Sequence, residues 1–211
     1  MARQYHHGDL KRSLLDAAVA FLADGRDFTM RELARRAKVT HNAPYRHFAD
    51  KEALLAAIAE EGFEMLAADG ARALAAAGGD PRAALRELGA SYVFFAVEHP
   101  HHFRLMFGLP LANVQAAHPS LGLAAQKSFA QLTDAIEAIR AGGLLRADRD
   151  PRGLAIIAWA LVHGLASLLV AGQLPGDVRA MAHLAIGDIA NVFFEGVLAA
   201  LPPAKAGASN P

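Results

Sequence analysis

Polar side chains that can contact nucleic acid lie close together between residues 40 and 51. Among them are Asn42, Arg46 and Lys51. In a DNA major groove, arginine can donate two hydrogen bonds to guanine, and asparagine can form a similar two-bond pair with adenine. Lys51 lies beside the expected start of a helix, where its charge adds to the positive end of the helix dipole and favours a phosphate. The group therefore has the chemistry to hold a DNA backbone and to read bases.

Two short helices joined by a turn are expected to position these side chains. Residues 29–32 read Thr-Met-Arg-Glu, a capping box in which the Thr hydroxyl and the Glu carboxylate satisfy free backbone donors at a helix start. We expect a turn at residues 37–39 and a second short helix from about Thr40, the proportions of a helix-turn-helix. Pro44 favours a start one or two residues later and is expected to keep Ala43 out of helical geometry.

Apolar residues around this segment can form a small core that supports the second helix. They are Leu14, Ala18, Phe21, Leu33, Ala34, Val39 and Phe48. Because so short a helix has little stability of its own, packing against its neighbours must fix its orientation. This packing leaves a set of side chains facing outward, namely Thr40, His41, Asn42, Ala43, Tyr45 and Arg46.

The run from Phe28 to Leu55 resembles the N-terminal domain of the tetracycline-repressor (TetR) family. Its most diagnostic part is Tyr-Arg-His-Phe at residues 45–48, followed by Lys-Glu and Leu-Leu at 51–52 and 54–55, and the match covers roughly residues 8–60. The resemblance implies that Tyr45 and Lys51 contact DNA phosphates and that Thr29 and Thr40 add contacts to the DNA backbone. It also implies that Asn42, Ala43 and Arg46 face the bases. The full set of expected DNA-contacting residues is Thr29, Thr40, Asn42, Ala43, Tyr45, Arg46, His47 and Lys51.

Charge is unevenly distributed along a chain of 211 residues with a formal net charge of zero. Residues 1–51 hold ten Lys and Arg against six Asp and Glu, a net charge of +4, so the remainder carries −4. A basic N-terminal segment followed by an acidic remainder suggests an anionic partner, although a solvated basic surface fits the same charge distribution. The arm at residues 1–8 contains Arg3, which either enters a minor groove or belongs to a disordered terminus.

Composition excludes several classes of function. The chain has no cysteine, which rules out disulfides, thiolate metal sites and cysteine nucleophiles. Residues 1–7 lack the apolar core of a secretion signal, so we expect a cytoplasmic protein. The sequence contains no nucleophile motif, phosphate-binding glycine loop or His-Glu-x-x-His pattern, and we therefore expect neither an enzyme nor a bound cofactor.

Helix signals recur along the whole chain and predict an all-α protein of about nine helices. Asp50 is expected to cap a long helix that ends near Ala77, and Gly-Gly pairs at 78–79 and 142–143 mark helix ends. We expect three parts: a three-helix helix-turn-helix domain at residues 1–51, including the arm, a ligand-binding and dimerisation domain at 52–201, and a disordered tail at 202–211.

Residues 154–172 are almost entirely apolar. A membrane span has this length, but we favour a helix that packs on its own core and on a second subunit, because it lies among amphipathic helices. Within it, Trp159, His163 and Gly164 resemble a Trp-His-Gly signature of one TetR subgroup. A last helix is expected from about residue 177 to 201. The expected dimer-interface residues are Ala160, Gly164, Ser167, Ala171, Ile189, Phe193 and Val197.

The middle of the chain is rich in aromatic residues, which serve equally as core or as the lining of an apolar pocket. The expected pocket residues are Tyr92, Phe95, Phe103, Met106, Phe107, Phe129, Trp159 and His163, with Tyr92 and His163 as polar anchors. Several histidines raise the alternative of a metal site. However, the run at residues 98–102, Glu-His-Pro-His-His, lacks the i, i+4 spacing of a helical ligand pair, so we expect no metal.

These observations predict a homodimeric transcriptional regulator that binds a palindromic operator in double-stranded DNA. The family resemblance implies repression that is relieved by a small, largely apolar effector, with the long helix at residues 50–77 transmitting the change. The alternative is a helical protein that binds a small molecule or a metal without binding DNA.

Overall fold

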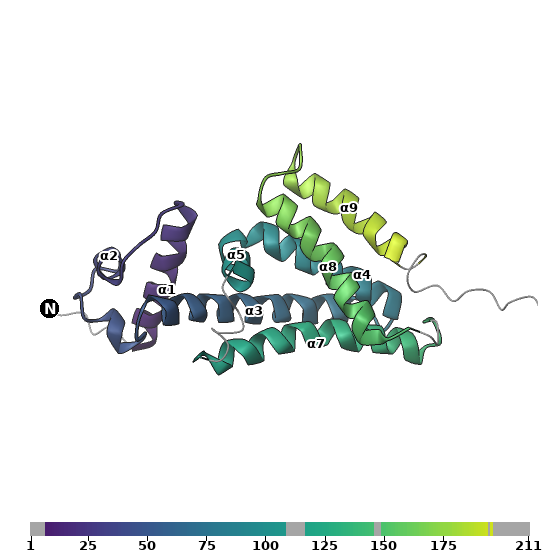
Figure 1. Cartoon of the computed structure of the whole chain (residues 1–211), viewed down its shortest axis with the longest axis horizontal. Helices are drawn as coiled ribbons and strands as arrows, with labels where there is room; N and C mark the ends of the chain where they lie inside the picture. Colours follow the sequence, from purple (N-terminus) through teal and green to yellow (C-terminus); the bar gives the residue numbers. More distant parts are fainter. Residues whose placement is uncertain (1–6, 109–116, 146–148, 194, 196–211) are drawn as a thin grey trace, which may run out of the picture. The chain divides into compact units, whose positions relative to one another are not determined.

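The computed structural model describes residues 7–108, 117–145, 149–193 and 195. Every regular element in these ranges is a helix, which confirms the predicted fold class (Figure 1). The elements are eight α-helices and one 3-10 helix, η1. In chain order they are α1 (His7–Ala23), α2 (Met30–Arg36), η1 (Pro44–Arg46), α3 (Lys51–Ala76), α4 (Pro81–Glu98), α5 (Pro100–Gly108), α7 (Pro119–Ala141), α8 (Pro151–Val170) and α9 (Val178–Val192).

Local sequence signals define the helix starts. Thr29 caps α2, because its hydroxyl accepts from the Glu32 N–H while the Glu32 carboxylate accepts from the Thr29 N–H. Asp50 accepts a hydrogen bond from the first turn of α3, and Asp150 accepts two from the first turn of α8. Pro151 follows at a position where its missing N–H costs nothing. The capping box and the long helix α3 are therefore confirmed.

The helices form two compact units. Among the described residues, unit 1 contains α1, α2, η1, α5, the part of α3 up to residue 65 and the part of α7 up to residue 126. Unit 2 contains the rest of α3 and α7 together with α4, α8 and α9. This division by compactness differs from the proposed functional domains at 1–51 and 52–201. The reason is that α3 side chains complete the core of unit 1.

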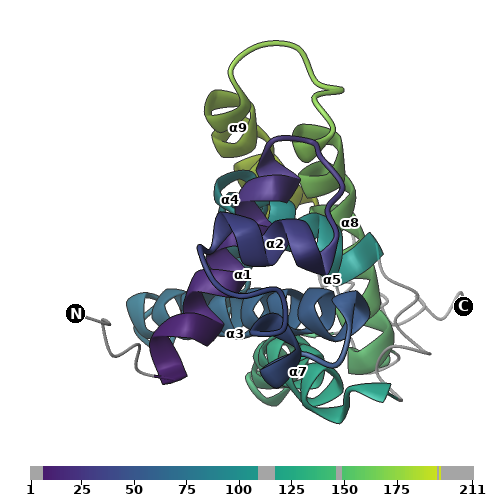
Figure 2. The same ribbon diagram turned by 90° about the vertical axis from the view of Figure 1, so that its left-hand side faces the viewer.

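The core of unit 1 joins α1, α2 and the start of α3, which lie side by side in Figure 2. It contains most of the predicted apolar set, with Val39 only half-buried. Leu54 and Ile58 of α3 are fully buried in the same cluster, and Leu105 of α5 packs against it. Phe21 and Phe28 stack with their ring centroids 5.3 Å apart. The helix-turn-helix therefore rests on a core that extends beyond residue 51.

Helices α3 and α5 approach closely at Gly62. A Cβ atom at this position would lie 2.6 Å from Met106 Sδ and 3.2 Å from His102 Cβ. Cβ atoms in protein structures are essentially never found as close as 2.6 Å to another heavy atom. Any larger residue at position 62 must therefore displace α5 or its side chains. The absence of a side chain at Gly62 therefore allows α5 to pack closely against the backbone of α3.

The core of unit 2 brings α4, α7, α8 and α9 together. One apolar cluster contains Ile136 and Ile139 of α7 with Leu154 and Ala158 of α8, and a second joins α4 to α9. Phe193, which the sequence assigned to the dimer interface, is 3% exposed and belongs to the first cluster. Its aromatic ring fills the core of its own chain, so it is not available on the surface.

Candidate functional site

The turn after α2 has the expected position and an unusual backbone. The Val39 N–H donates to the Ala34 carbonyl at 3.0 Å, which closes the end of α2. Lys38 has a φ of 56°, in the left-handed region that residues other than glycine seldom adopt. This conformation turns the chain sharply between residues 37 and 39, as the helix-turn-helix requires.

The second helix of the motif is shorter than the sequence predicts. It is a single 3-10 turn, η1, that begins at Pro44 rather than at about Thr40. Residues 40–43 form a turn in which the Ala43 N–H donates to the Thr40 carbonyl at 2.9 Å. The expectation for Ala43 was wrong, since its φ of −62° and ψ of −40° are helical. The steric bias of a following proline is overcome here because the Ala43 carbonyl accepts a hydrogen bond from Arg46.

Most of the expected DNA-contacting side chains lie on the surface of this segment. Thr40, Asn42 and Arg46 are exposed, and Tyr45 is 53% exposed, which is unusual for so large a ring. Ala43 is buried, and for this reason we leave it out of the surface that could face bases. His47 is half-buried beside Phe48.

Thr29 and Lys51 are both engaged within the protein. The Thr29 hydroxyl takes part in the capping box. Lys51 forms an ion pair with Asp27 and places its ammonium 4.8 Å from the centroid of the Phe28 ring. The hydrogen bond from Lys51 is the main cause that lowers the pKa of Asp27. Because the Asp27 carboxylate is highly exposed, a phosphate can replace it at little cost.

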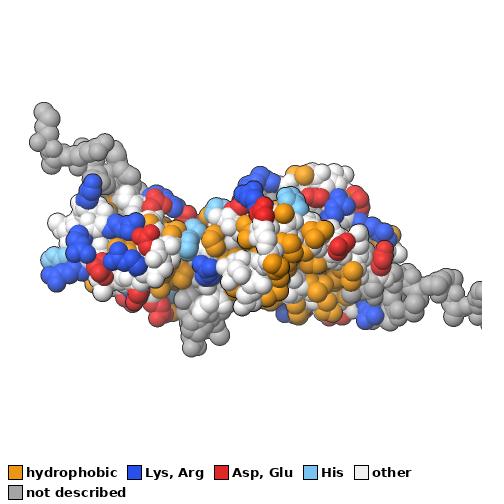
Figure 3. Space-filling model, turned by 90° about the horizontal axis from the view of Figure 1, so that it is seen from above, with side chains coloured by type: hydrophobic (Ala, Val, Ile, Leu, Met, Phe, Trp, Pro, Cys, Tyr) orange, Lys and Arg blue, Asp and Glu red, His pale blue; other side chains and the backbone are white. Residues whose placement is uncertain are grey.

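A hollow of about 340 Å³ lies beside α2 in unit 1. Its lining residues are Arg31, Glu32, Ala34, Arg35, Val39 and His41. Arg31 and Arg35 are exposed and are four residues apart, which places them on one face of α2. Figure 3 shows Lys and Arg side chains grouped over this part of the molecule. Arg31 and Arg35 are not among the residues predicted to contact DNA, although their spacing of four residues is a signal for a basic face of α2.

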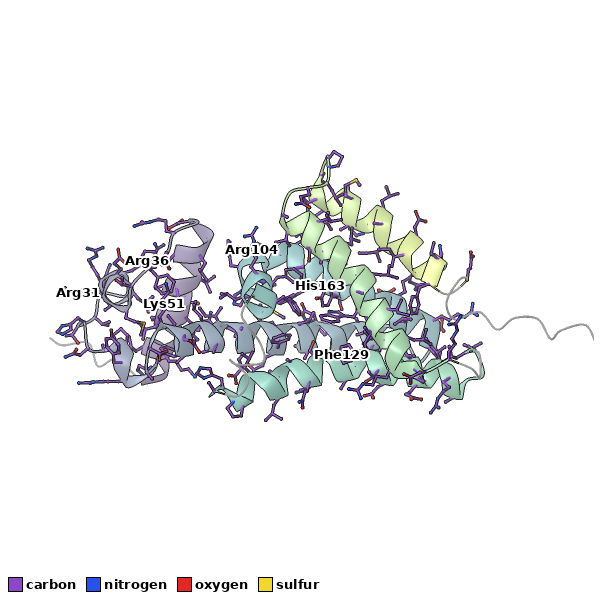
Figure 4. The ribbon with its side chains drawn as sticks, viewed as in Figure 1. Arg31, Arg36, Lys51, Arg104, Phe129 and His163 are labelled. Atoms are coloured by element: carbon purple, nitrogen blue, oxygen red, sulfur yellow. The ribbon has the colours of Figure 1, made fainter. Side chains whose placement is uncertain are left out.

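Four of the predicted pocket residues meet in unit 2, where Figure 4 labels two of them. Trp159 Nε1 donates to the Tyr92 hydroxyl oxygen at 3.2 Å, and that hydroxyl lies 2.8 Å from His163 Nδ1. Phe129 packs edge-on against Trp159 with ring centroids 6.1 Å apart. Burial raises the pKa of Tyr92 and lowers the pKa of His163, so both groups are neutral near pH 7. We call Tyr92, Phe129, Trp159 and His163 the aromatic cluster.

The other predicted pocket residues do not belong to the aromatic cluster. Phe103, Met106 and Phe107 are in unit 1, where Phe107 packs against Phe103 and Phe63 with centroid distances of 5.1 and 5.6 Å. Phe95 is buried in unit 2. The sequence could not separate these groups, because aromatic residues on adjacent helical turns face different neighbours.

Helices α8 and α9 present an apolar surface, seen in Figure 3 as an orange area. Its large exposed side chains are Ile156, Ile157, Leu161, Leu168, Leu184 and Val192. Ala160 and Gly164 on α8 and Ala171 just after its end are exposed, while Ser167 and Ile189 are half-buried. Val197 lies outside the described residues, as do residues 1–6 and the tail. Among the described helices, α8 alone is long and apolar enough to cross a membrane, and 28% of its apolar window is buried within the chain.

His102 is a buried polar residue that the sequence did not predict. Arg12 of α1 forms an ion pair with one oxygen of Glu61 on α3, whereas the other oxygen, Oε2, is buried without a hydrogen bond in the described structure. Nε2 of His102 on α5 is likewise buried without a hydrogen bond in the part of the chain that the structure describes. Burial lowers the pKa of His102, and the charge of Glu61 partly opposes this shift.

The buried histidine leads to a prediction about pH. Because the folded protein holds the pKa of His102 below the unfolded value, the unfolded chain binds a proton first as the pH falls. Stability should therefore decrease from about pH 6.5 downward, and the groups facing His102 are Glu61, Arg12, His99 and His101. We expect His102→Phe to reduce the loss of melting temperature between about pH 7.5 and pH 5.

The control for this prediction is Phe103→Leu, a neighbouring core change without a titrating group. It should lower the melting temperature equally at both pH values. If His102→Phe leaves the pH dependence of the wild type unaltered, His102 does not contribute to it.

Comparison with known proteins decides the family. A model for bacterial regulatory proteins of the tetR family matches residues 14–58, and a model for the tetracyclin repressor-like C-terminal domain matches residues 85–189. The chain belongs to the TetR family. This TetR protein is a DNA-binding transcriptional regulator, and the tetR-family match at residues 14–58 includes the helix-turn-helix of unit 1. TetR-family regulators are generally not enzymes.

Solved structures share this fold. A protein with unknown function from Rhodococcus sp. RHA1 is 34% identical to this TetR protein, with a TM-score of 0.77 over 94% of this chain and 100% of that chain. A tetR-family regulatory protein from Rhodococcus RHA1 has 20% identity and a TM-score of 0.69, covering 91% and 98% of the two chains. PfmR, a TetR family regulator from Thermus thermophilus, has 21% identity and a TM-score of 0.63, covering 85% and 97%. No match was found among curated protein sequences.

Proposed function

We propose that this TetR regulator is a homodimeric, cytoplasmic repressor that leaves a palindromic operator when a small, largely apolar effector binds unit 2. The observation that carries the proposal is the surface around η1. There, exposed Asn42, Tyr45 and Arg46 stand on a turn supported by a buried core. Repression and effector control are the usual family mode. Two copies of this surface would meet half-sites about 34 Å apart, or a multiple of that distance.

Dimerisation is proposed through α8 and α9. Both helices carry large apolar side chains on the surface of a single chain, and exposed patches of this kind commonly mark protein interfaces. The small residues Ala160 and Gly164 would allow a second helix to approach closely. A partner subunit would also explain why only 28% of the apolar window of α8 is buried within the chain, without any need for a membrane.

The DNA contacts can be separated by type. Lys51→Ala should weaken binding to every DNA sequence alike, because a phosphate contact carries no sequence information. Each protomer would lose one phosphate contact, so the slope of log affinity against log salt should fall by about 1.8 for the dimer. Arg46→Ala should mainly reduce the preference for the cognate operator over random duplex, by about 1–3 kcal/mol for each lost base contact. Fluorescence anisotropy with both duplexes at several salt concentrations measures these effects.

Two variants serve as controls for the DNA contacts. Lys127→Ala removes an exposed lysine from unit 2 and should change neither affinity nor slope. Asp27→Asn frees Lys51 from its ion pair and should strengthen binding to all duplexes. Equal losses on cognate and random DNA for Arg46→Ala would contradict the base contact, and an unchanged salt slope for Lys51→Ala would contradict the phosphate contact.

A further inference from the structure

Two stacked phenylalanine rings support cations in the helix-turn-helix. Phe21 of α1 and Phe28, which precedes the α2 cap, are both buried, with ring centroids 5.3 Å apart and planes inclined by 23°. The Arg36 guanidinium lies 4.7 Å from the centroid of Phe21, and the Lys51 ammonium lies 4.8 Å from that of Phe28. Figure 4 labels both cations in unit 1. A cation therefore lies against each ring of the stack.

The same two cations pair with carboxylates. Arg36 forms an ion pair with Asp24 at 3.3 Å, and Lys51 forms one with Asp27. The Asp27 side chain is 88% exposed, and an ion pair so open to water contributes little stability. Water and competing ions can reach Asp27, whereas the Phe28 ring is fixed in the core of unit 1. Of these two contacts of Lys51, the carboxylate is exchangeable and the ring is permanent.

An aromatic ring is a suitable support for a cation that must also bind a phosphate. The ring face attracts an ammonium through its quadrupole but carries no net charge. It therefore holds the Lys51 side chain without neutralising it, as a buried carboxylate would. A lysine stem is flexible, and ordering it when a complex forms costs free energy. Because contact with Phe28 orders the stem before DNA arrives, less of this cost remains at binding.

We propose that Phe28 is a positioning residue for DNA binding: its ring holds the Lys51 ammonium at the start of α3, where a DNA phosphate takes the place of Asp27. This inference rests on the proposed phosphate contact of Lys51 and adds the residue that prepares this contact. The first turn of α3 favours the same phosphate, because the positive end of the helix dipole lies there. The ring contact persists in the complex, and only the anion changes.

Fluorinated phenylalanines at position 28 test this role without removing the ring from the core. Each fluorine draws electron density from the ring face and weakens its attraction for a cation, whereas Phe28→Leu would also leave a cavity. Site-specific incorporation of 4-fluoro-, 3,5-difluoro- and 3,4,5-trifluorophenylalanine gives a graded series in the full-length protein. Fluorescence anisotropy with a labelled duplex of random sequence measures the affinity. We expect a stepwise loss that reaches about two- to fivefold for each protomer.

Two controls isolate the contact between the ring and Lys51. The same fluorinated residues at Phe21 alter the same stack but lie against Arg36, so they should leave DNA affinity unchanged. In a Lys51→Ala background, fluorination at position 28 should have no further effect, since no ammonium remains to be positioned. Circular dichroism and thermal unfolding show whether each variant is folded.

The salt dependence separates positioning from contact. Fluorination at Phe28 removes no charge, so the slope of log affinity against log salt should stay constant through the series. Lys51→Ala removes the cation itself and should lower that slope. A variant that was merely less stable would not reproduce this difference between affinity and slope.

Proton NMR gives an independent readout of the ring contact. Protons above an aromatic face are shifted upfield by the ring current, so the ε-methylene protons of Lys51 should resonate upfield of those of the exposed Lys127. Loss of the signal in Lys51→Ala assigns it. We expect the upfield shift to persist when the random-sequence duplex binds.

Three results would overturn the inference while leaving the phosphate contact of Lys51 intact. They are an affinity that does not change along the Phe28 series, an equal loss when Phe21 is fluorinated, and disappearance of the upfield shift when DNA binds. Failure of the phosphate contact is distinguishable: Lys51→Ala would then keep the affinity and the salt slope of the wild type, and the positioning role of Phe28 would be overturned with it.

Discussion

Replacing Leu161 with glutamate should convert the dimer into monomers and abolish tight operator binding. Leu161 is 41% exposed on α8, in the middle of the apolar surface that we propose as the interface. In a symmetric dimer the substitution introduces two carboxylates, and burying each without a partner costs several kcal/mol. The dimer dissociation constant should therefore rise by about a thousandfold or more. Sedimentation velocity measures the assembly, and anisotropy with the full operator measures DNA binding.

The matched control places the same charge at Leu123 of α7. This side chain is 66% exposed and does not belong to the apolar surface of α8 and α9. Leu123→Glu should remain dimeric and bind the operator as the wild type does. A Leu161→Glu protein that is still dimeric at micromolar concentration would show that subunits associate through a different surface.

Truncation of Leu33 to alanine should destabilise the DNA-binding motif more than any surface change. Leu33 lies on α2, is fully buried and contacts the cluster that holds α1, α2 and the start of α3 together. Core Leu→Ala substitutions cost about 2–5 kcal/mol, because they remove apolar contacts and leave a cavity. Since a domain is stable by only about 5–15 kcal/mol, we expect lower operator affinity at 37 °C and a lower urea midpoint.

Leu123→Ala provides the comparison for this prediction. It removes the same atoms from an exposed position of unit 1, so its effect should stay within about 0.5 kcal/mol. Urea unfolding followed by circular dichroism distinguishes the two variants. Equal midpoints for Leu33→Ala and Leu123→Ala would mean that the core around α2 contributes little to stability.

The features that the sequence predicted well are encoded by neighbouring residues. The capping box at Thr29 and the caps at Asp50 and Asp150 each depend on groups two or three positions apart. The burial of Leu14 and Leu33 follows from helical periodicity. Features set by residues so close in the sequence can be predicted without knowing the tertiary structure.

Features that depend on contacts distant in the sequence could not be predicted. The ion pair of Lys51 with Asp27 spans 24 residues, and that of Arg12 with Glu61 spans 49. Burial of Phe193 depends on the way α9 returns to α7 and α8, which periodicity does not specify. The second motif helix is shortened to η1, in which the Ala43 and Pro44 carbonyls accept hydrogen bonds from the N–H groups of Arg46 and His47.

The extent of unit 1 has a consequence for engineering regulators by exchanging their parts. A chimaera joined at residue 51 would separate α1 and α2 from Leu54, Ile58 and Leu105, which share their core. It would also part Arg12 from Glu61. A chimaeric regulator designed to respond to a different inducer should therefore take residues 1–65 and α5 from the same parent protein, because these segments share one apolar interior.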